Sequence, residues 1–256
     1  MPSVLVEAAP MGLVLAVLGD SVGVGIGDPA LGGGWRGFGP LLAEALGGAR
    51  LTNLAVSGSR VGGVLEKQLP AALAARPDVA VLMVGMNDTM RSDFDPAQLR
   101  ADLDHVVGAL VAVGSTVITA KYHEHHRVFR LPGPIRRALA GRIAALNGIL
   151  DVIGARHGVC VLDLGAVPGI YDPRAWAVDR LHPSELGHRL LAKAIADQLA
   201  AKGTTVHKEV SLQCAGGRTP GRLARWGWLV FKGVPWLVRR GRDLVPYAIS
   251  TFVRRG

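Results

Sequence analysis

The sequence has little cysteine and no long uninterrupted hydrophobic run. These two features argue against a disulfide-rich protein and against a membrane-spanning helix. Only two of its 256 residues are cysteines. That is too few for a disulfide framework and fits a reducing compartment. No apolar run reaches the length of a membrane-spanning helix. The one early apolar stretch has no Lys or Arg before it. It therefore does not read as a secretory signal peptide, and we expect a cytoplasmic protein.

Charge is balanced over most of the chain but not near its C-terminal end. Residues 205–256 hold ten Lys or Arg and two Asp or Glu, whereas residues 1–204 hold nineteen and eighteen. The length suits one sizeable α/β domain better than two. We therefore expect a nearly neutral domain over 1–204, a polar linker over 205–218 and a basic tail over 219–256.

Apolar runs and helical patterns alternate five times along the domain. This alternation predicts an α/β fold: a three-layer α/β/α sandwich around a five-stranded parallel sheet with right-handed crossovers. The strands are expected within residues 13–18, 50–56, 78–85, 115–122 and 159–164. The helices are expected over 40–46, from 60 with a break at Pro70, over 95–114, over 134–156 and over 183–199.

A serine follows the first strand directly, in the stretch LVLAVLGDS that ends at Ser21. Ligands of open α/β sheets bind at the carboxyl ends of the strands, so we interpret Ser21 as a nucleophile. A serine needs a base, normally a histidine that a carboxylate orients. Of the eight histidines, His182 combines this sheet edge with a nearby carboxylate, Asp179. Taken singly, Ser21 also suits a turn cap, and Asp179 and His182 also suit a surface turn before a helix.

Acyl transfer also needs hydrogen-bond donors for the oxyanion that develops. The candidates are the backbone N–H groups of Ser21 and Gly58 and the side-chain amide of Asn87, which follow the first three strands. An ordinary turn at Gly58 and a helix cap at Asn87 are the structural alternatives.

Two stretches suggest a cofactor or a metal and fit neither well. The glycine-rich stretch after Ser21 lacks the G-x-G-x-x-G spacing of a dinucleotide site, and Pro29 follows soon after. The run from His123 to His126 contains three histidines and one glutamate. Zinc needs converging ligands, so we interpret this run as a solvated or substrate-facing lip. No cofactor and no metal are expected.

Four short motifs in order resemble the SGNH (GDSL) hydrolase family over about residues 13–200. They are Gly19-Asp20-Ser21, Gly58, Gly85-x-Asn87-Asp88 and Asp179-x-x-His182. The resemblance implies the SGNH hydrolase fold, which is flavodoxin-like. It also implies Ser21 as nucleophile, His182 as base, Asp179 as its orienting partner, and an oxyanion hole of Ser21, Gly58 and Asn87.

The chain departs from the family pattern at Gly23, often Thr, and at Met86, often Gly. We take these departures as variation on the substrate side, and we expect Asp20, Met86 and His123 to contact the substrate. The expected function is a serine esterase or lipase-like acyl hydrolase acting on a small-molecule or lipid ester. The alternatives are an acyltransferase with a sugar or lipid alcohol as acceptor, and a non-catalytic membrane-bound module.

The basic tail mixes tryptophan, aliphatic and cationic residues. Trp226, Trp228 and Trp236 alternate with Arg and Lys, and Pro235 and Pro246 interrupt the helical spacing. This composition is typical of a segment that lies on an anionic membrane surface, which would make the protein peripheral at the inner membrane surface. Packing on the domain or on a second subunit is equally compatible. The aliphatic content argues against nucleic acid.

Overall fold

Short apolar segments form a five-stranded parallel sheet. In a computed structural model, residues 12–129, 131 and 133–215 are described. The strands are β1 (Val14–Gly19), β2 (Arg50–Asn53), β3 (Val79–Met83), β4 (Thr116–Lys121) and β5 (Cys160–Asp163). Their order is β2-β1-β3-β4-β5, and all four pairings are parallel. This is the flavodoxin-like order, so the predicted fold class is confirmed.

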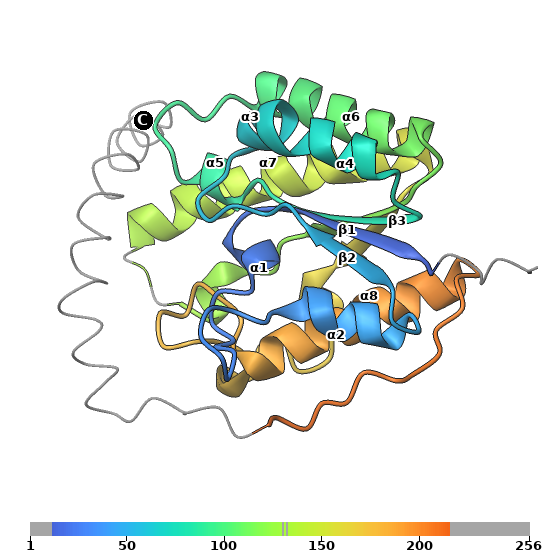
Figure 1. The fold of residues 1–256 in the computed structure, drawn as a ribbon. Helices are drawn as coiled ribbons and strands as arrows, with labels where there is room; N and C mark the ends of the chain where they lie inside the picture. The colour runs from blue at the N-terminus through green and yellow to red at the C-terminus, as the bar shows by residue number, and fades with distance from the viewer. Residues whose placement is uncertain (1–11, 130, 132, 216–256) are drawn as a thin grey trace, which may run out of the picture.

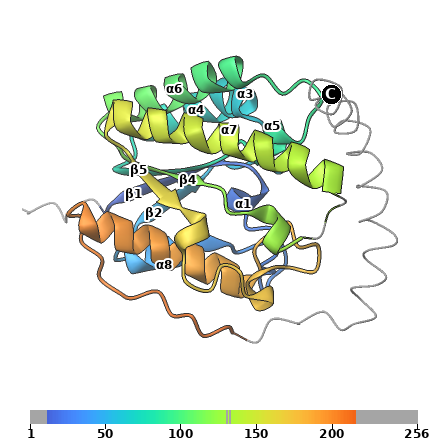
Figure 2. The same cartoon turned by 180° about the vertical axis from the view of Figure 1, so that it is seen from behind.

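Helices cover both faces of the sheet (Figures 1 and 2). One layer contains α3 (Val61–Gly63), α4 (Leu69–Ala75), α5 (Met86–Thr89), α6 (Pro96–Ala112) and α7 (Gly133–His157). The other contains α2 (Phe38–Ala45) and α8 (Glu185–Ala201), which pack on each other. Every residue of β3 is buried, as expected for a strand covered on both sides.

Most predicted elements occur, and the differences have local causes. Asp95 caps α6 and Pro96 is its first residue, as predicted. The last helix begins at Glu185 rather than at Pro183, because the Ser184 side chain accepts a hydrogen bond from the Gly187 N–H and caps it there. α2 begins at Phe38 rather than at Pro40.

Two further differences lie beside the carboxyl ends of β1 and β2. β2 ends at Asn53 and not at Val56. The Asn53 side chain donates to Gly23 O and accepts from Ala55 N–H. Beyond it the chain stays beside β1, because the N–H groups of Leu54 and Val56 donate to Val17 O and Gly19 O. Sequence analysis also missed the one-turn helix α1 (Ser21–Val24), which Asp20 caps and which ends at Gly25 with a positive φ.

The helix predicted from residue 60 is interrupted before Pro70 by a π-helical segment, η1 (Val64–Gln68). The 3-10 turns η2 (His125–Arg127), η3 (Leu164–Ala166) and η4 (Pro173–Ala175) lie in the loops after β4 and β5. A π segment inside an α-helix often marks a functional position. Here it brings the Gln68 side chain to the end of β1.

Within the part of the chain that the structure describes, α7 alone is long and apolar enough to cross a membrane. Its most apolar stretch is 44% buried inside the fold. The helix packs against β4, β5 and α6. Packing in the core of the fold therefore explains the apolar side of α7.

Residues 204–215 run in an irregular strap along α2 and α8, drawn in orange in Figure 1. The N–H groups of His207 and Lys208 both donate to Ala45 O, and Val210 is buried. The Ala215 N–H donates to the Glu185 carboxylate at 2.7 Å, at the first turn of α8. The rest of the expected linker and the tail over 219–256 lie outside the described residues.

Candidate active site

The carboxyl end of β1 places Ser21 at the edge of the sheet. Gly19 has a φ of 134°, and a Cβ at this position would lie 1.9 Å from Met83 O. Only glycine therefore fits between β1 and β3 at this point. The next residue, Asp20, donates its N–H to Met83 O and accepts from Val22 N–H. Ser21 thus becomes the first residue of α1.

The imidazole of His182 lies between Ser21 and Asp179. Its Nε2 is 2.9 Å from Ser21 Oγ, and its Nδ1 is 2.6 Å from Asp179 Oδ2. Ser21 and His182 are separated by 161 residues in the sequence. The fold therefore joins the three residues that the sequence analysis selected into one hydrogen-bonded chain.

A tight turn fixes the relation between Asp179 and His182. Asp179 Oδ1 accepts from the N–H groups of Leu181 and His182, while Arg180 adopts a φ of 58°. Burial raises the pKa of Asp179, but the hydrogen bonds and the charge of His182 outweigh it, so the net pKa is lowered. Asp179 is therefore held ionised and can orient the imidazole.

The predicted oxyanion donors are not equally placed. Among the described residues, the N–H groups of Ser21 and Gly58 have no acceptor. Gly58 is exposed, has a φ of 80° and lies outside the lining of the cavity described below. The Asn87 amide does line that cavity, but it donates to Asp20 Oδ2 at 3.3 Å and to Ser59 O at 3.1 Å.

Asp20 is a buried carboxylate beside this amide. Only 2% of its surface is exposed, and burial raises its pKa to about 7, against the lowering effects of the Val22 N–H and of the charge on His182. Its two oxygens accept from Val22 N–H and from the Asn87 amide. Asp20 therefore connects the start of α1 to the amide on α5.

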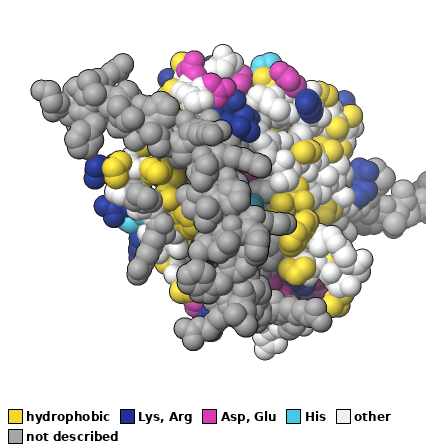
Figure 3. Space-filling view, turned by 90° about the vertical axis from the view of Figure 1, so that its left-hand side faces the viewer, with side chains coloured by type: hydrophobic (Ala, Val, Ile, Leu, Met, Phe, Trp, Pro, Cys, Tyr) yellow, Lys and Arg dark blue, Asp and Glu magenta, His cyan; other side chains and the backbone are white. Residues whose placement is uncertain are grey.

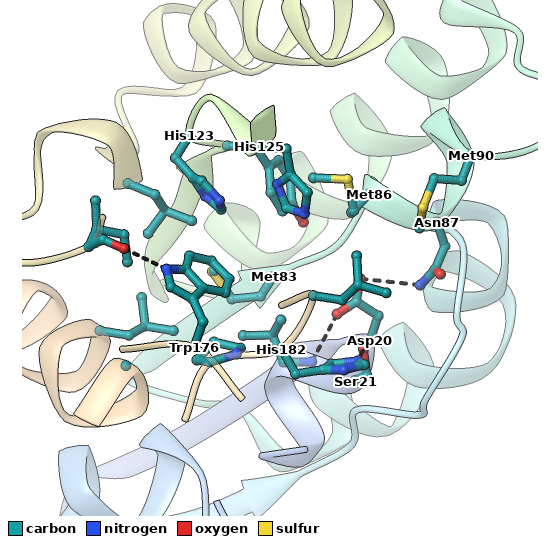
Figure 4. Close-up of a pocket in the computed structure, with 18 residues that line it drawn as sticks. Asp20, Ser21, Met83, Met86, Asn87, Met90, His123, His125, Trp176 and His182 are labelled. Carbon is teal, nitrogen blue, oxygen red and sulfur yellow. Dashed lines mark hydrogen bonds between the residues drawn. The ribbon is translucent and has the colours of Figure 1, made fainter. Parts of the chain in front are cut away.

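A cavity opens beside Ser21 and His182 (Figure 4). It measures about 110 Å³. An engineered cavity of ~150 Å³ holds a benzene molecule, so this one suits a short aliphatic group. Both Asp20 and Met86 line it, as does His123, so all three expected substrate contacts face one space. Its other walls are mostly apolar and include Met83, Met90, Tyr122, Leu164, Ile170, Trp176, Leu181 and Leu191.

The histidine run after β4 divides by burial. His123 and His125 are 3% and 7% exposed and both line the cavity, whereas Glu124 and His126 are exposed. His123 and His125 therefore turn toward the cavity, whereas Glu124 and His126 turn toward solvent, and a contact with substrate stays a prediction. Sequence analysis named His123 as a contact and missed His125. The alternation was the available signal, because i and i+2 face the same side of an extended segment.

Metal-ligand clustering is not seen in this run. Within the described ranges, no group of three or more His, Cys, Asp or Glu side chains is arranged to hold a metal ion. The two inward histidines stack on each other, with ring centroids 4.6 Å apart.

Gln68 is a second residue that sequence analysis missed. Its Oε1 accepts from Gly19 N–H at 2.8 Å and its Nε2 donates to Gly19 O at 2.9 Å. The side chain is 3% exposed. The side-chain amide therefore pairs with the backbone of Gly19, two residues before Ser21, in the way that the peptide group of a neighbouring strand would. Nothing in the local sequence pattern marks this contact, because it joins positions that are 49 residues apart.

Figure 3 views the molecule from the side of the strands' carboxyl ends. Where described residues form this face, hydrophobic side chains appear in groups with charged side chains between them.

Comparisons with known proteins show the family and the fold of the chain. The sequence profile of the GDSL-like Lipase/Acylhydrolase family matches residues 17–190. A search of curated proteins finds no significant match.

Solved structures share the fold. LAE5, an alpha/beta hydrolase enzyme from the metagenome of Lake Arreo, is 24% identical, with a TM-score of 0.58 over 75% of this chain and 96% of its own. The acetylxylan esterase Axe2 from Geobacillus stearothermophilus is 21% identical, with a TM-score of 0.59 over 73% and 94%. TesA is 25% identical, with a TM-score of 0.58 over 73% and 98%. Because the profile match covers most of the chain, the protein belongs to the GDSL-like Lipase/Acylhydrolase family and is a GDSL-type carboxylic ester hydrolase.

Proposed function

We propose that the protein hydrolyses esters through an acyl-enzyme on Ser21, with His182 as general base and Asp179 as its orienting carboxylate. The observation that carries the proposal is the unbroken chain of contacts from Ser21 Oγ to His182 Nε2 and from His182 Nδ1 to Asp179 Oδ2. A serine hydroxyl is a weak nucleophile until a base of this kind removes its proton.

The reaction has two halves. In the first, His182 takes the Ser21 proton while Oγ forms a bond to the ester carbonyl carbon; the imidazolium then gives that proton to the departing alcohol oxygen as the C–O bond breaks. In the second, His182 takes a proton from water, whose oxygen attacks the acyl-enzyme, and returns it to Ser21 Oγ. Asp179 stays ionised throughout and stabilises the imidazolium.

The proposed oxyanion hole consists of the Ser21 N–H, the Gly58 N–H and the Asn87 amide. The first two donors have no acceptor among the described residues. The amide of Asn87 would leave Asp20 or Ser59 O to reach the substrate oxygen. Hydrogen bonds of this kind are often looser before substrate binds. Each donor of an oxyanion hole lowers the activation barrier by on the order of 3 kcal/mol.

The proposal is tested with Ser21→Ala. We expect turnover of 4-nitrophenyl butyrate to fall by at least about a thousandfold, because no other hydroxyl takes the place of the nucleophile. A fluorophosphonate probe should label the wild-type protein and not the variant. Thermal unfolding of both proteins serves as the folding control. Unchanged turnover in Ser21→Ala would contradict the mechanism.

Product analysis shows whether water or an alcohol accepts the acyl group from the acyl-enzyme. With an added sugar or lipid alcohol, a hydrolase releases free acid only, whereas an acyltransferase forms a new ester from the same acyl-enzyme. We expect free acid as the main product. A new ester as the main product would assign the protein to acyl transfer.

A further inference from the structure

Two histidine side chains in the cavity wall have no assigned role in the acyl-transfer steps. His123 and His125 lie across Trp176 from Ser21 and His182 (Figure 4). Trp176 is buried and donates its indole N–H to Ile170 O. The His123 ring centroid is 4.6 Å from that of Trp176. Both histidines therefore face the same space as the proposed nucleophile.

The segment that carries these histidines is fixed at both sides. Tyr122 N–H donates to Asn147 Oδ1 and Asn147 Nδ2 donates to Tyr122 O, both at 2.8 Å. The Glu124 N–H donates to the Tyr171 hydroxyl. Side chains on such a clamped segment lose little further freedom when they bind a ligand, which favours a binding role.

The ring nitrogens are buried without partners. His123 Nδ1, His123 Nε2 and His125 Nδ1 have no hydrogen-bond partner among the described residues. An unpaired polar atom in an apolar site costs about 1–3 kcal/mol. A phenylalanine or leucine would fill the same volume without that cost. The pair is therefore explained if a bound molecule supplies the missing hydrogen bonds.

The chemistry of the pair selects the kind of group it can bind. Burial is the main cause that lowers the pKa of His123 to about 3 and that of His125 to about 4, so both rings are neutral near pH 7. A neutral imidazole offers one N–H donor and one acceptor nitrogen. No Lys or Arg is among the residues that line the cavity. A carboxylate or phosphate would therefore meet no positive charge in this wall.

A hydroxyl group matches this pair, since it is small and uncharged and both donates and accepts a hydrogen bond. We propose that His123 and His125 bind a hydroxyl group carried by the ester substrate, so that the enzyme prefers hydroxylated esters to their unsubstituted counterparts. The proposal rests on the proposed esterase function. The hydroxyl belongs either to the acyl part or to the alcohol part of the ester, and the experiment separates these two sources.

The experiment compares kcat/KM for two matched pairs of esters. The acyl pair is 4-nitrophenyl butyrate and 4-nitrophenyl 3-hydroxybutyrate. The alcohol pair is propyl acetate and 2,3-dihydroxypropyl acetate. We expect the hydroxylated ester to be preferred by about tenfold or more in one pair, because a site built to hydrogen-bond a hydroxyl discriminates strongly against its absence. That pair identifies which part of the ester carries the hydroxyl.

Variants connect the preference to the histidines. In His123→Phe and in His125→Phe the preference should fall to within about twofold, mainly through KM, while the unsubstituted ester is still cleaved. His125→Gln keeps a donor and an acceptor and should retain most of the preference. The matched control is His126→Phe, an exposed position in the same turn, which should leave the preference unchanged.

The outcomes separate this proposal from the function on which it rests. If the wild type cleaves the unsubstituted esters in a Ser21-dependent way but shows no preference in either pair, the hydroxyl site is wrong and the esterase function stands. A preference that survives in both phenylalanine variants overturns it as well. If neither pair is cleaved and the fluorophosphonate does not label Ser21, the proposed function itself fails. Thermal unfolding and labelling rates show whether each variant is folded.

Discussion

At the residue scale, Asp20 controls where the Asn87 amide points. The Asn87 Nδ2 donates to Asp20 Oδ2, while Asp20 Oδ1 accepts from Val22 N–H at the start of α1. One buried carboxylate therefore connects the backbone beside Ser21 to a proposed oxyanion donor. We infer that Asp20 is a positioning residue, which acts through Asn87.

This role predicts the effect of Asp20→Asn. The new side chain keeps an oxygen for Val22 N–H, but its NH2 group then faces the NH2 group of Asn87, and two donors cannot pair. We expect kcat to fall by about tenfold to a hundredfold with little change in KM, because the lost interaction matters mainly in the transition state. Steady-state kinetics on a soluble ester measure both constants.

A double-mutant cycle supplies the control. If Asp20 acts through Asn87, adding Asp20→Asn to Asn87→Ala should lower kcat little further. Full multiplication of the two losses would mean that Asp20 affects the reaction independently. Circular dichroism and thermal unfolding check that each variant keeps the fold.

Sequence analysis found the residues of this site that stand in motifs and missed those that depend on three-dimensional contact. Ser21, Asp179 and His182 follow predicted strands or precede a predicted helix, so topology alone gathers them. The hydrogen bonds that the Asn87 amide donates to Asp20 Oδ2 and to Ser59 O depend on side-chain rotamers and on contacts between distant parts of the chain. No spacing in the chain encodes such a choice.

At the element scale, the π-helical segment η1 turns a helix into a support for β1. It presents Gln68, whose amide pairs with both the N–H and the C=O of Gly19. The strand pairing of β2 with β1 ends at Val17 and Asn53, although the Val56 N–H beyond it still donates to Gly19 O at 3.1 Å. The Gln68 side chain therefore supplies the acceptor for the Gly19 N–H and a second donor for Gly19 O.

Replacing Gln68 with leucine should reveal this support. Gln68→Leu leaves the buried Gly19 N–H without its acceptor, whereas Gly19 O keeps the Val56 N–H, so we expect the free energy of unfolding to fall by roughly 1–3 kcal/mol. We also expect a lower kcat, because Ser21 lies two residues beyond Gly19. Urea denaturation and kinetics on 4-nitrophenyl butyrate measure the two effects.

The matched control is Lys67→Leu, an exposed neighbour in the same segment. It should change stability by less than about 0.5 kcal/mol, as is usual for surface substitutions. An equally small change in Gln68→Leu would show that water replaces the side chain at no cost.

The elements themselves were largely predictable because their patterns are strong. The five strands and the long helices α6 and α7 appear within a few residues of the prediction. The one-turn helix α1 was missed although Asp20 and Gly25 are typical cap residues, because the glycine-rich stretch that begins at Gly23 suggested a loop. The break predicted at Pro70 lies earlier in the chain, in the π-helical segment η1 that the local pattern did not indicate, and Pro70 stands in the first turn of α4.

At the scale of the whole molecule, the strap over residues 204–215 directs the chain toward the active-site edge. It starts beyond the end of α8, runs back along α2 and α8, and reaches the first turn of α8 at Ala215 (Figure 1). Glu185 there also accepts from Arg36 and Arg189. Burial raises the pKa of Glu185, but its hydrogen bonds outweigh that effect and lower the pKa to about 2, so the carboxylate is ionised.

The described chain ends at Ala215, beside the first turn of α8. Glu185 lies three residues after His182, so the described chain ends on the side of the fold that carries the proposed catalytic residues. The sequence over 219–256 combines three tryptophans and many arginines with aliphatic residues. We propose that this tail binds an anionic lipid surface, which would bring a lipid ester close to the cavity.

Deletion of residues 219–256 tests the proposed membrane contact. The linker and the tail, residues 205–256, carry most of the net charge of +9. Each Lys or Arg near an anionic surface contributes about 1 kcal/mol to the free energy of membrane binding. We therefore expect the full chain to pellet with vesicles that contain anionic lipid, much less with neutral ones, and less at high salt.

The truncated chain should lose this binding and still cleave 4-nitrophenyl butyrate, because none of the residues in the proposed mechanism belongs to the tail. Equal pelleting of both proteins would favour packing of the tail on the domain or on a second copy, and a rise in apparent mass of the full chain alone in gel filtration would identify the second copy.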